Sequence, residues 1–207
     1  MNKIKLLNLH AGIGGNRKGF INHNNIEVTA VELDPEIAKI YKEFYPNDNI
    51  IIGDAKEYLL NNYKKYDIIW VSPPCVSHSR IRAMASKRGD YLPIFPDLEL
   101  YQFIIFLKEF CKNKFWIVEN VIPYYEPLIK PKGKLGRHLI WSNFDFEEIP
   151  IIELDKIKHN KVSSTSIKYG IDISKFKLKK RKDQIIRNCV NPQIGEHLLE
   201  TILKNKK

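Results

Sequence analysis

The sequence predicts an α/β fold in which helices cover both faces of a doubly wound, mostly parallel sheet. Short apolar runs alternate with longer amphipathic stretches along much of the 207 residues, as expected when parallel strands are joined by crossover helices. A glycine-rich turn follows the first apolar run directly. A chain of this length can bury one hydrophobic core, so we expect residues 1–207 to form a single domain.

Apolar runs and amphipathic stretches mark the individual elements. The predicted strands are Lys3–His10, Glu27–Leu33, Asn49–Asp54, Tyr66–Val71, Phe115–Val121 and Leu139–Trp141. The predicted helices are Pro35–Phe44, Ala55–Tyr63, Asp97–Cys111 and Ile194–Leu203. Asp34 precedes a proline and Asp97 opens the long third helix, so both acids are predicted N-caps.

The composition changes near Phe146, where the chain becomes strongly charged and loses a clear period. This stretch contains Ser163–Ser166 and the basic run Lys177–Lys182. We predict an insertion at 145–186, followed by a segment at 187–207 that returns to the main domain because the apolar pattern resumes at Ile185.

Charge and cysteine content narrow the function classes. The net charge of +10 and pI near 9.4 favour association with phosphate polymers, although a lysine-rich solvated surface gives the same totals. The three cysteines are far apart and form no CxxC pair, so we expect neither a metal site nor a disulfide. The sequence shows no signal peptide and no membrane span, which predicts a cytoplasmic protein.

Glycines and acids lie at the predicted carboxyl ends of the first three strands, where open α/β sheets bind cofactors. The turn His10-Ala11-Gly12-Ile13-Gly14-Gly15 follows the first strand, and its glycines allow a ligand close to the backbone. Glu32 is placed to bind a ribose, and Asp54 to accept a hydrogen bond from an adenine amine. The alternatives are an ordinary tight turn and acids that only cap helices or face solvent.

A thiol and a carboxyl follow at the ends of the next two strands. Pro73 and Pro74 stiffen the loop before Cys75, which holds this cysteine at the sheet edge. Glu119 ends the adjacent strand and is predicted to lie beside it. Cys111 lies in an apolar helix and is instead expected to be a buried hydrophobic residue. The alternative for Glu119 is an acid that only caps an element at the surface.

With these motifs in order, the chain resembles the cytosine-5 DNA methyltransferase family. The resemblance rests on Ala11–Gly15, Glu32, Asp54, Pro73-Pro74-Cys75 with Ser77 and Ser79, Glu119-Asn120-Val121, Gly136–Asn143 and Arg187–Pro192. Asn8 and His10 depart from it, since an acid and an aromatic are usual there. The resemblance implies the S-adenosyl-L-methionine-dependent methyltransferase fold and a flipped cytosine as acceptor.

The resemblance also implies the roles of the site residues. Cys75 attacks carbon 6 of cytosine as the nucleophile, and Glu119 holds the ring nitrogen and amino edge. Arg137 faces the cytosine, although a shift of one residue would put His138 there. The donor S-adenosyl-L-methionine is expected to contact His10, Ala11, Gly12, Ile13, Gly14, Glu32, Leu33, Asp54, Ala55, Pro73, Asn188 and Val190.

Double-stranded DNA is the expected partner, because a base inside a duplex must be flipped out to reach such a pocket. The predicted substrate-side residues are Ser77, Ser79, Arg80, Arg82, Lys87, Arg88 and His138, the four basic ones after Cys75 lying in a mobile loop that closes on phosphates. The insertion 145–186 is a much shortened recognition region, so we expect a short target sequence, with Lys and Arg of 156–182 on the DNA backbone.

Three alternatives stay open at this point. A partner protein could supply part of the target recognition. The enzyme could act on RNA cytosine, since some relatives methylate transfer RNA. The chain could also be a catalytically silent donor- or DNA-binding regulator, although the presence of both Cys75 and Glu119 weakens that hypothesis.

Overall fold

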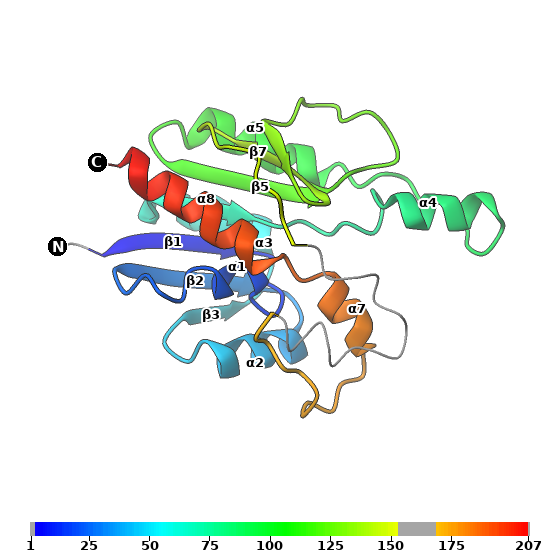
Figure 1. The fold of residues 1–207 in the computed structure, drawn as a ribbon, viewed down its shortest axis with the longest axis horizontal. Coiled ribbons are helices and arrows are strands. Elements are labelled where there is room, and N and C mark those ends of the chain that lie inside the picture. The colour runs from blue at the N-terminus through cyan, green and yellow to red at the C-terminus, as the bar shows by residue number, and fades with distance from the viewer. Residues whose placement is uncertain (1–2, 153–168, 207) are drawn as a thin grey trace.

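The computed structural model describes residues 3–152 and 169–206, and its core is a seven-stranded sheet (Figure 1). The strands are β1 (Ile4–Leu9), β2 (Ile26–Glu32), β3 (Asn49–Ile52), β4 (Ile68–Val71), β5 (Phe115–Val121), β6 (Gly133–Leu135) and β7 (His138–Ser142). The helices are α1 (Gly15–Lys18), α2 (Pro35–Phe44), α3 (Ala55–Asn62), α4 (Arg80–Lys87), α5 (Glu99–Phe110), α7 (Lys182–Arg187) and α8 (Pro192–Asn205), and the turn η1 (Tyr63–Lys65) follows α3.

The strand order is β3-β2-β1-β4-β5-β7-β6. The first five strands are parallel, and β7 runs antiparallel to both β5 and β6. Because the strand order reverses between β1 and β4, the carboxyl ends of these strands meet at a crevice. The predicted doubly wound, mostly parallel sheet is therefore confirmed, and β6 is an additional strand.

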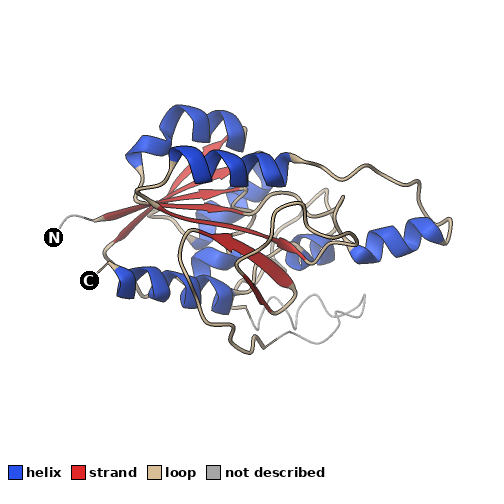
Figure 2. Cartoon of the chain, turned by 90° about the horizontal axis from the view of Figure 1, so that it is seen from above, coloured by secondary structure: helices blue, strands red, loops and turns tan. Residues whose placement is uncertain are grey.

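Helices cover both faces of the sheet (Figure 2). On one face, side chains of α3 and α5 pack against alternate strand residues such as Leu7, Ile69 and Val118. On the other face, α8 packs against residues of the opposite parity, among them Leu6 and Ile117. Burial on both faces explains why the strands are almost continuously apolar.

The first and last helices approach each other very closely. A Cβ on Gly19 would lie 2.3 Å from the carbonyl oxygen of Pro192, and one on Gly195 would lie 2.3 Å from that of Asn16. Only glycine leaves room for such backbone contact. α8 is thereby held against the turn that follows β1.

The predicted helix caps are confirmed at Asp34 and corrected at Asp97. Asp34 accepts hydrogen bonds from the backbone amides of Glu36 and Ile37, with Pro35 as the first residue of α2. Asp97 accepts one from the amide of Glu99 at 2.9 Å, but Leu98 occupies the cap position of α5. The helix thus starts two residues later than predicted.

The basic segment after Cys75 is a helix and not the predicted loop. The hydroxyl of Ser79 accepts a hydrogen bond from the amide of Arg82, which caps α4. α4 projects from the body at the end opposite the two termini (Figure 1). We call residues 76–98, which contain α4 and its connections, the arm.

The described part of the predicted insertion packs on the main body. Ile171 and Ile173 are fully buried, in one cluster with Ile13 and Ile37. Lys175 and Lys180 form ion pairs with Glu43 and Asp34. Residues 153–168, including Ser163–Ser166, lie outside the described residues. Within the described residues, Lys175 and Lys180 thus lie near acids within and flanking α2, and the expectation that basic residues of 156–182 contact DNA phosphates stays a prediction.

No helix in residues 3–152 and 169–206 is long and apolar enough to span a membrane.

Candidate active site

A cavity of about 750 Å³ opens at the carboxyl edge of the parallel strands. Its walls come from the turn after β1, the ends of β2 and β3, the loop after β4, the end of β5, the start of β7 and the segment 180–190. The glycine turn and Cys75 therefore line one continuous space, as the sequence predicted for a donor and an acceptor site.

Gly12 and Glu32 line the part of the cavity where the sequence predicts the donor. Gly12 has φ +55°, and a Cβ there would meet no atom within 4 Å, so a ligand can approach the backbone closely. Its amide donates to Glu32 Oε2 at 2.9 Å, and the amide of Asp34 donates to Oε1 at 2.9 Å. These two bonds orient the carboxylate and leave each oxygen a further lone pair for a ligand hydroxyl.

Gly14 is the one predicted donor residue that does not line the cavity. It caps α1 with φ +80°, and its carbonyl accepts a hydrogen bond from the hydroxyl of Tyr45 at 2.7 Å. Tyr45 also lies under the guanidinium of Arg17, which forms a largely buried ion pair with Asp48 at 2.6 Å. Gly14 thus fixes the glycine turn to the end of α2.

Asn8 is fully buried and pairs side chain to side chain with Asn16, the two amide groups exchanging hydrogen bonds of 2.8 and 3.2 Å. The departure from the family pattern at this position therefore serves the packing between β1 and α1.

His10 takes the left-handed conformation, φ 54°, which is unusual for a residue other than glycine. Its ring packs edge-on against Phe103, and its Nε2 lies 3.9 Å from Glu99. Burial lowers its pKa to about 4, so the imidazole is neutral at physiological pH. Its buried Nδ1 has no partner within the described residues and is available for a ligand.

The last motif folds back beside the first. Asn188 and Val190 line the cavity, and a Cβ on Gly15 would lie 2.2 Å from the Val190 carbonyl and 2.3 Å from Cys189 Sγ. Gly15 therefore has to be glycine for the two segments to meet.

All the other predicted donor residues line the same cavity. Sequence reasoning missed several of its walls, namely Val31, Asp34, Pro35, Ile37, Gly53, Glu99, Lys180, Arg181, Gln184, Ile185 and Arg187. Asp54 also caps α3 by accepting a hydrogen bond from the amide of Glu57 at 2.8 Å, so the alternative prediction of a helix cap is also correct for this acid.

Cys75 is half-buried and lines the cavity in the loop after β4, the strand that pairs with β1. The side chain of Asn120 donates to the carbonyl of Pro73 at 3.0 Å and so anchors the proline loop to β5. The pKa of the thiol is raised by burial and by Glu119, and Arg137 opposes this rise. In the free protein the nucleophile candidate is thus a thiol at neutral pH.

Glu119 is buried at the end of β5, and burial raises its pKa to about 7. A hydrogen bond from Ser72 and the positive charge of Arg137 lower the pKa, but do not cancel the effect of burial. A carboxyl group with this pKa can hold or release a proton near neutrality.

His138, and not Arg137, lines the cavity beside Glu119. The His138 Nε2 lies 3.7 Å from Glu119 Oε2, and burial lowers the histidine pKa to about 3. The contact therefore involves a neutral imidazole and is no ion pair. Arg137 is exposed, and its Nη2 donates to the carbonyl of Arg187 at 2.5 Å. The preferred alignment has to be corrected: Arg137 acts on the site through its charge.

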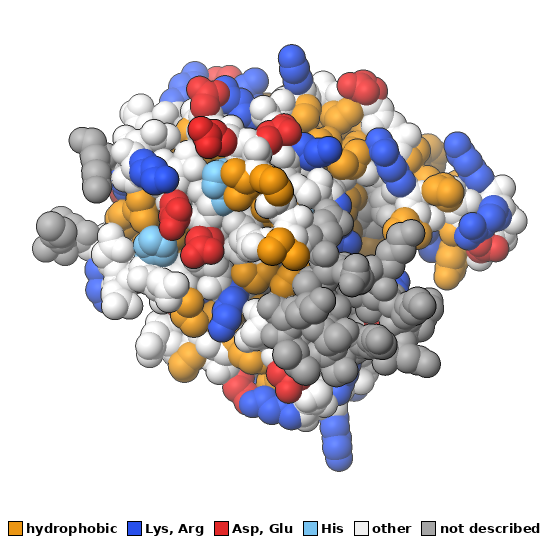
Figure 3. Space-filling view, in the orientation of Figure 1, with side chains coloured by type: hydrophobic (Ala, Val, Ile, Leu, Met, Phe, Trp, Pro, Cys, Tyr) orange, Lys and Arg blue, Asp and Glu red, His pale blue; other side chains and the backbone are white. Residues whose placement is uncertain are grey.

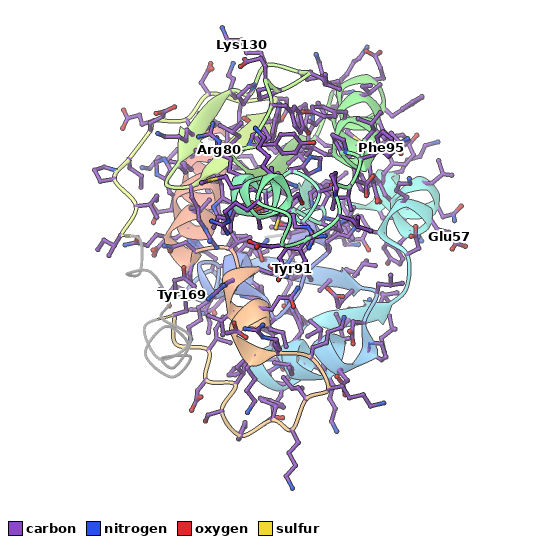
Figure 4. All side chains as sticks on the ribbon, turned by 90° about the vertical axis from the view of Figure 1, so that its right-hand side faces the viewer. Glu57, Arg80, Tyr91, Phe95, Lys130 and Tyr169 are labelled. Carbon is purple, nitrogen blue, oxygen red and sulfur yellow. The ribbon has the colours of Figure 1, made fainter. Side chains whose placement is uncertain are left out.

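The other predicted substrate residues lie outside the cavity, at or within the arm. Ser77 accepts from the amide of Asp97 at 3.0 Å, and Arg80 donates to the carbonyl of Pro123 at 2.9 Å. Ser79 caps α4, whereas Arg82, Lys87 and Arg88 extend along it. Figure 4 looks onto this end and labels Arg80, Tyr91 and Phe95 there. Figure 3 shows basic and hydrophobic side chains interleaved on the arm.

No group of three or more His, Cys, Asp or Glu side chains suited to a metal ion occurs within the described ranges.

Comparison with known proteins assigns the class. A model of the C-5 cytosine-specific DNA methylases matches residues 4–124, which is more than half of the chain. The chain therefore belongs to the C-5 cytosine-specific DNA methylase family, and its sheet with two helical layers is the α/β methyltransferase fold.

Individual relatives are distant and longer. The chain is 26% identical over 124 residues to the Type II methyltransferase M1.HphI of Haemophilus parahaemolyticus, covering 57% of this chain and 32% of that protein. It is 24% identical over 147 residues to the Type II methyltransferase M.HgiBI of Herpetosiphon aurantiacus, covering 70% and 31%. The chain spans about a third of the length of these relatives. Among solved structures, a variant of Spodoptera frugiperda DNMT2 is 25% identical, covering 57% of this chain and 36% of that one, with a TM-score of 0.42.

Proposed function

We propose that this protein is a DNA cytosine-5 methyltransferase that uses S-adenosyl-L-methionine as the methyl donor and Cys75 as the nucleophile. One observation carries the proposal: Cys75 and Glu119 share a single cavity with the glycine turn and Glu32. Family membership supports the reaction class.

The donor half has the chemistry that S-adenosyl-L-methionine requires. A cavity of about 750 Å³ is within the range of small-molecule sites, and Gly12 leaves its backbone open to a ligand. Glu32 would hold the ribose hydroxyls and Asp54 the adenine amine, while Asn188 and Val190 contribute the wall next to the glycine turn. When bound, the donor supplies an electrophilic methyl group.

Cys75 and Glu119 divide the activation of cytosine between them. The Cys75 sulfur, as thiolate, forms a bond to carbon 6 of the flipped base, and the displaced electron pair makes carbon 5 nucleophilic. Glu119 donates a proton to the ring nitrogen as negative charge grows there. After carbon 5 is methylated, its proton leaves to solvent, the carbon–sulfur bond breaks to release the thiolate, and the ring nitrogen returns its proton to Glu119.

His138 and Arg137 support this chemistry in different ways. The neutral ring of His138 would contact the base next to Glu119. The charge of Arg137, which favours the ionised form of Cys75, would help the thiol lose its proton when the base displaces water.

The arm supplies the contact to DNA in this proposal. Arg80, Arg82, Lys87 and Arg88 carry positive charge on the segment that follows the nucleophile in the chain, which suits phosphate binding. Only residues 143–181 separate β7 from α7, and this short recognition segment supports a short target sequence.

A covalent trap tests the proposal. Protein and S-adenosyl-L-methionine are incubated with duplex DNA in which 5-fluorocytosine replaces cytosine, because fluorine cannot leave as a proton does. We expect a stable adduct that Cys75→Ala abolishes and that Cys111→Ala, a matched buried cysteine, leaves intact. An adduct on matched RNA alone would overturn the choice of DNA. Intact donor binding without an adduct on either polymer would favour the silent regulator.

A further inference from the structure

Ser72 and Glu119 lie side by side at the ends of two paired strands. The register of β4 and β5 pairs Trp70 with Ile117 and Val71 with Val118. Trp70 and Ile117 belong to the same core cluster. Since strand residues alternate between faces, Ser72 and Glu119, each two residues further on, project from this same face at the cavity wall.

The indole of Trp70 determines how the Ser72 hydroxyl points. Trp70 Nε1 donates to Ser72 Oγ at 3.0 Å, and the indole is fully buried. A tryptophan N–H can only donate, and a serine hydroxyl carries a single proton. With Oγ accepting from Trp70, the hydroxyl proton of Ser72 remains to be donated, and the strand register and the shared cavity wall place the carboxyl group of Glu119 beside it. A hydrogen bond from Ser72 to Glu119 would lower the pKa of that carboxyl group, in the same direction as the electrostatics of the site.

We propose that Ser72 is a positioning residue for Glu119, and that the relay from Trp70 through Ser72 fixes the orientation of this carboxyl group and favours its ionised form. The consequence of this relay for catalysis rests on the proposed function.

Other groups facing Glu119 act differently. The His138 imidazole is neutral and lies 3.7 Å away, and the Arg137 guanidinium is exposed. Water and salt screen the charge of Arg137, and the neutral ring of His138 is too far from the carboxyl group for a hydrogen bond. Both therefore affect Glu119 less than a hydrogen bond from Ser72 would. The titratable or charged groups that face Glu119 from the packed elements are Cys75, Arg137, His138 and Cys189.

The relay predicts a non-additive pair of mutations. Ser72→Ala removes the hydroxyl that stabilises the carboxylate, so the pKa of Glu119 should rise by about one pH unit, as expected for one hydrogen bond to a charged acceptor. Trp70→Phe frees the hydroxyl to rotate, so it should raise the pKa by less. In the Ser72→Ala background, Trp70→Phe should have no further effect, because Trp70 acts only through Ser72.

The pKa is measured directly by NMR titration of protein labelled with carbon-13 in the glutamate carboxyl groups, with Glu119→Gln identifying the signal. Ser72→Thr, which keeps a hydroxyl, should restore the wild-type pKa. Ser77→Ala removes a hydroxyl bonded to the Asp97 amide and should change nothing. Equal pKa values in wild type and folded Ser72→Ala, or additive effects of Ser72 and Trp70, would overturn the relay.

This readout does not depend on activity. If the pKa values behave as expected but no DNA or RNA adduct forms, the relay stands and the proposed function fails. If adducts form while Ser72→Ala leaves the pKa unchanged, the function stands and the relay fails. If the relay and the proposed function both hold, the alkaline limb of the pH profile for adduct formation should move to higher pH in Ser72→Ala, because Glu119 then keeps its proton to higher pH.

Discussion

Replacing Glu119 by glutamine should make the protein more stable at alkaline pH. Glu119 is buried, and its pKa rises from the ordinary 4.5 to about 7. Because one pH unit of pKa corresponds to about 1.4 kcal/mol, keeping this group ionised in the folded state costs about 3 kcal/mol. Glu119→Gln keeps the shape of the side chain without the charge.

The direction of the pH dependence follows from the raised pKa. Below about pH 4.5 the carboxyl is protonated in both the folded and the unfolded chain, so the two proteins should be equally stable. As the pH rises from 4.5 towards 7, the unfolded chain releases this proton first, and wild type loses stability relative to Glu119→Gln. Above pH 7 the difference reaches its full value of about 3 kcal/mol.

Urea unfolding at several pH values between 4.5 and 8.5 measures this difference. Glu57→Gln, at an exposed glutamate of α3, is the control and should show no such pH dependence. A Glu119→Gln protein whose stability parallels that of wild type at every pH would refute the reasoning, since it would mean that water or another group compensates the buried charge.

Three further outcomes are expected. Asp48→Ala should destabilise the fold by up to about 3 kcal/mol in urea unfolding, because it leaves the largely buried guanidinium of Arg17 without its carboxylate partner. Adding Arg17→Met should recover part of this loss, and an unchanged unfolding midpoint would count against a structural role of the pair. Gly15→Ala should lower the free energy of unfolding by about 1–3 kcal/mol, because the added Cβ would lie 2.2 Å from the Val190 carbonyl oxygen. Gly53→Ala is the control and should melt like wild type, because its Cβ would meet no atom within 4 Å. Equal melting temperatures of the two variants would contradict the close contact between Gly15 and Val190. Iodoacetamide should modify only Cys75 among the three cysteines of the native protein, because the other two are buried. The rate should keep rising into the alkaline range, because the pKa of the Cys75 thiol is raised. Peptide mass spectrometry identifies the labelled residue, and labelling of a second cysteine would contradict the burial of the other two.

The sheet and most helices could be predicted from the sequence because their signals are local. The apolar strands and the Asp34-Pro35 cap are confirmed by the structure. The predicted positions of Cys75 and Glu119 at neighbouring strand ends follow from the same pattern, because parallel strands bring their carboxyl ends to one edge.

α4 was missed because it is short and rich in basic residues, and because the apolar residues Ile81 and Met84 at helical spacing are not buried in the core. The helix projects into solvent, and Ile81 and Met84 are 82% and 60% exposed. Two signals could have found it: Ser79 as an N-cap and the helix-forming residues that follow it.

The choice between Arg137 and His138 needed the strand register. β7 pairs antiparallel with β5, placing Ile140 opposite Glu119. Alternation then puts His138 on the same face as Ile140 and turns Arg137 away. The walls contributed by Lys180, Arg181 and Gln184 could not be predicted, because they reach the cavity through tertiary packing and not through a local pattern.

The contacts at Gly15, Gly19 and Gly195 have a consequence for how the protein is made. They join the turn after β1 to residues separated from it by most of the chain, so the donor cavity has high contact order. On the ribosome, the first strands emerge long before Val190 and α8. A nascent chain therefore exposes an incomplete cavity until synthesis passes these residues, and a ligand that needs all of the cavity walls can bind only afterwards.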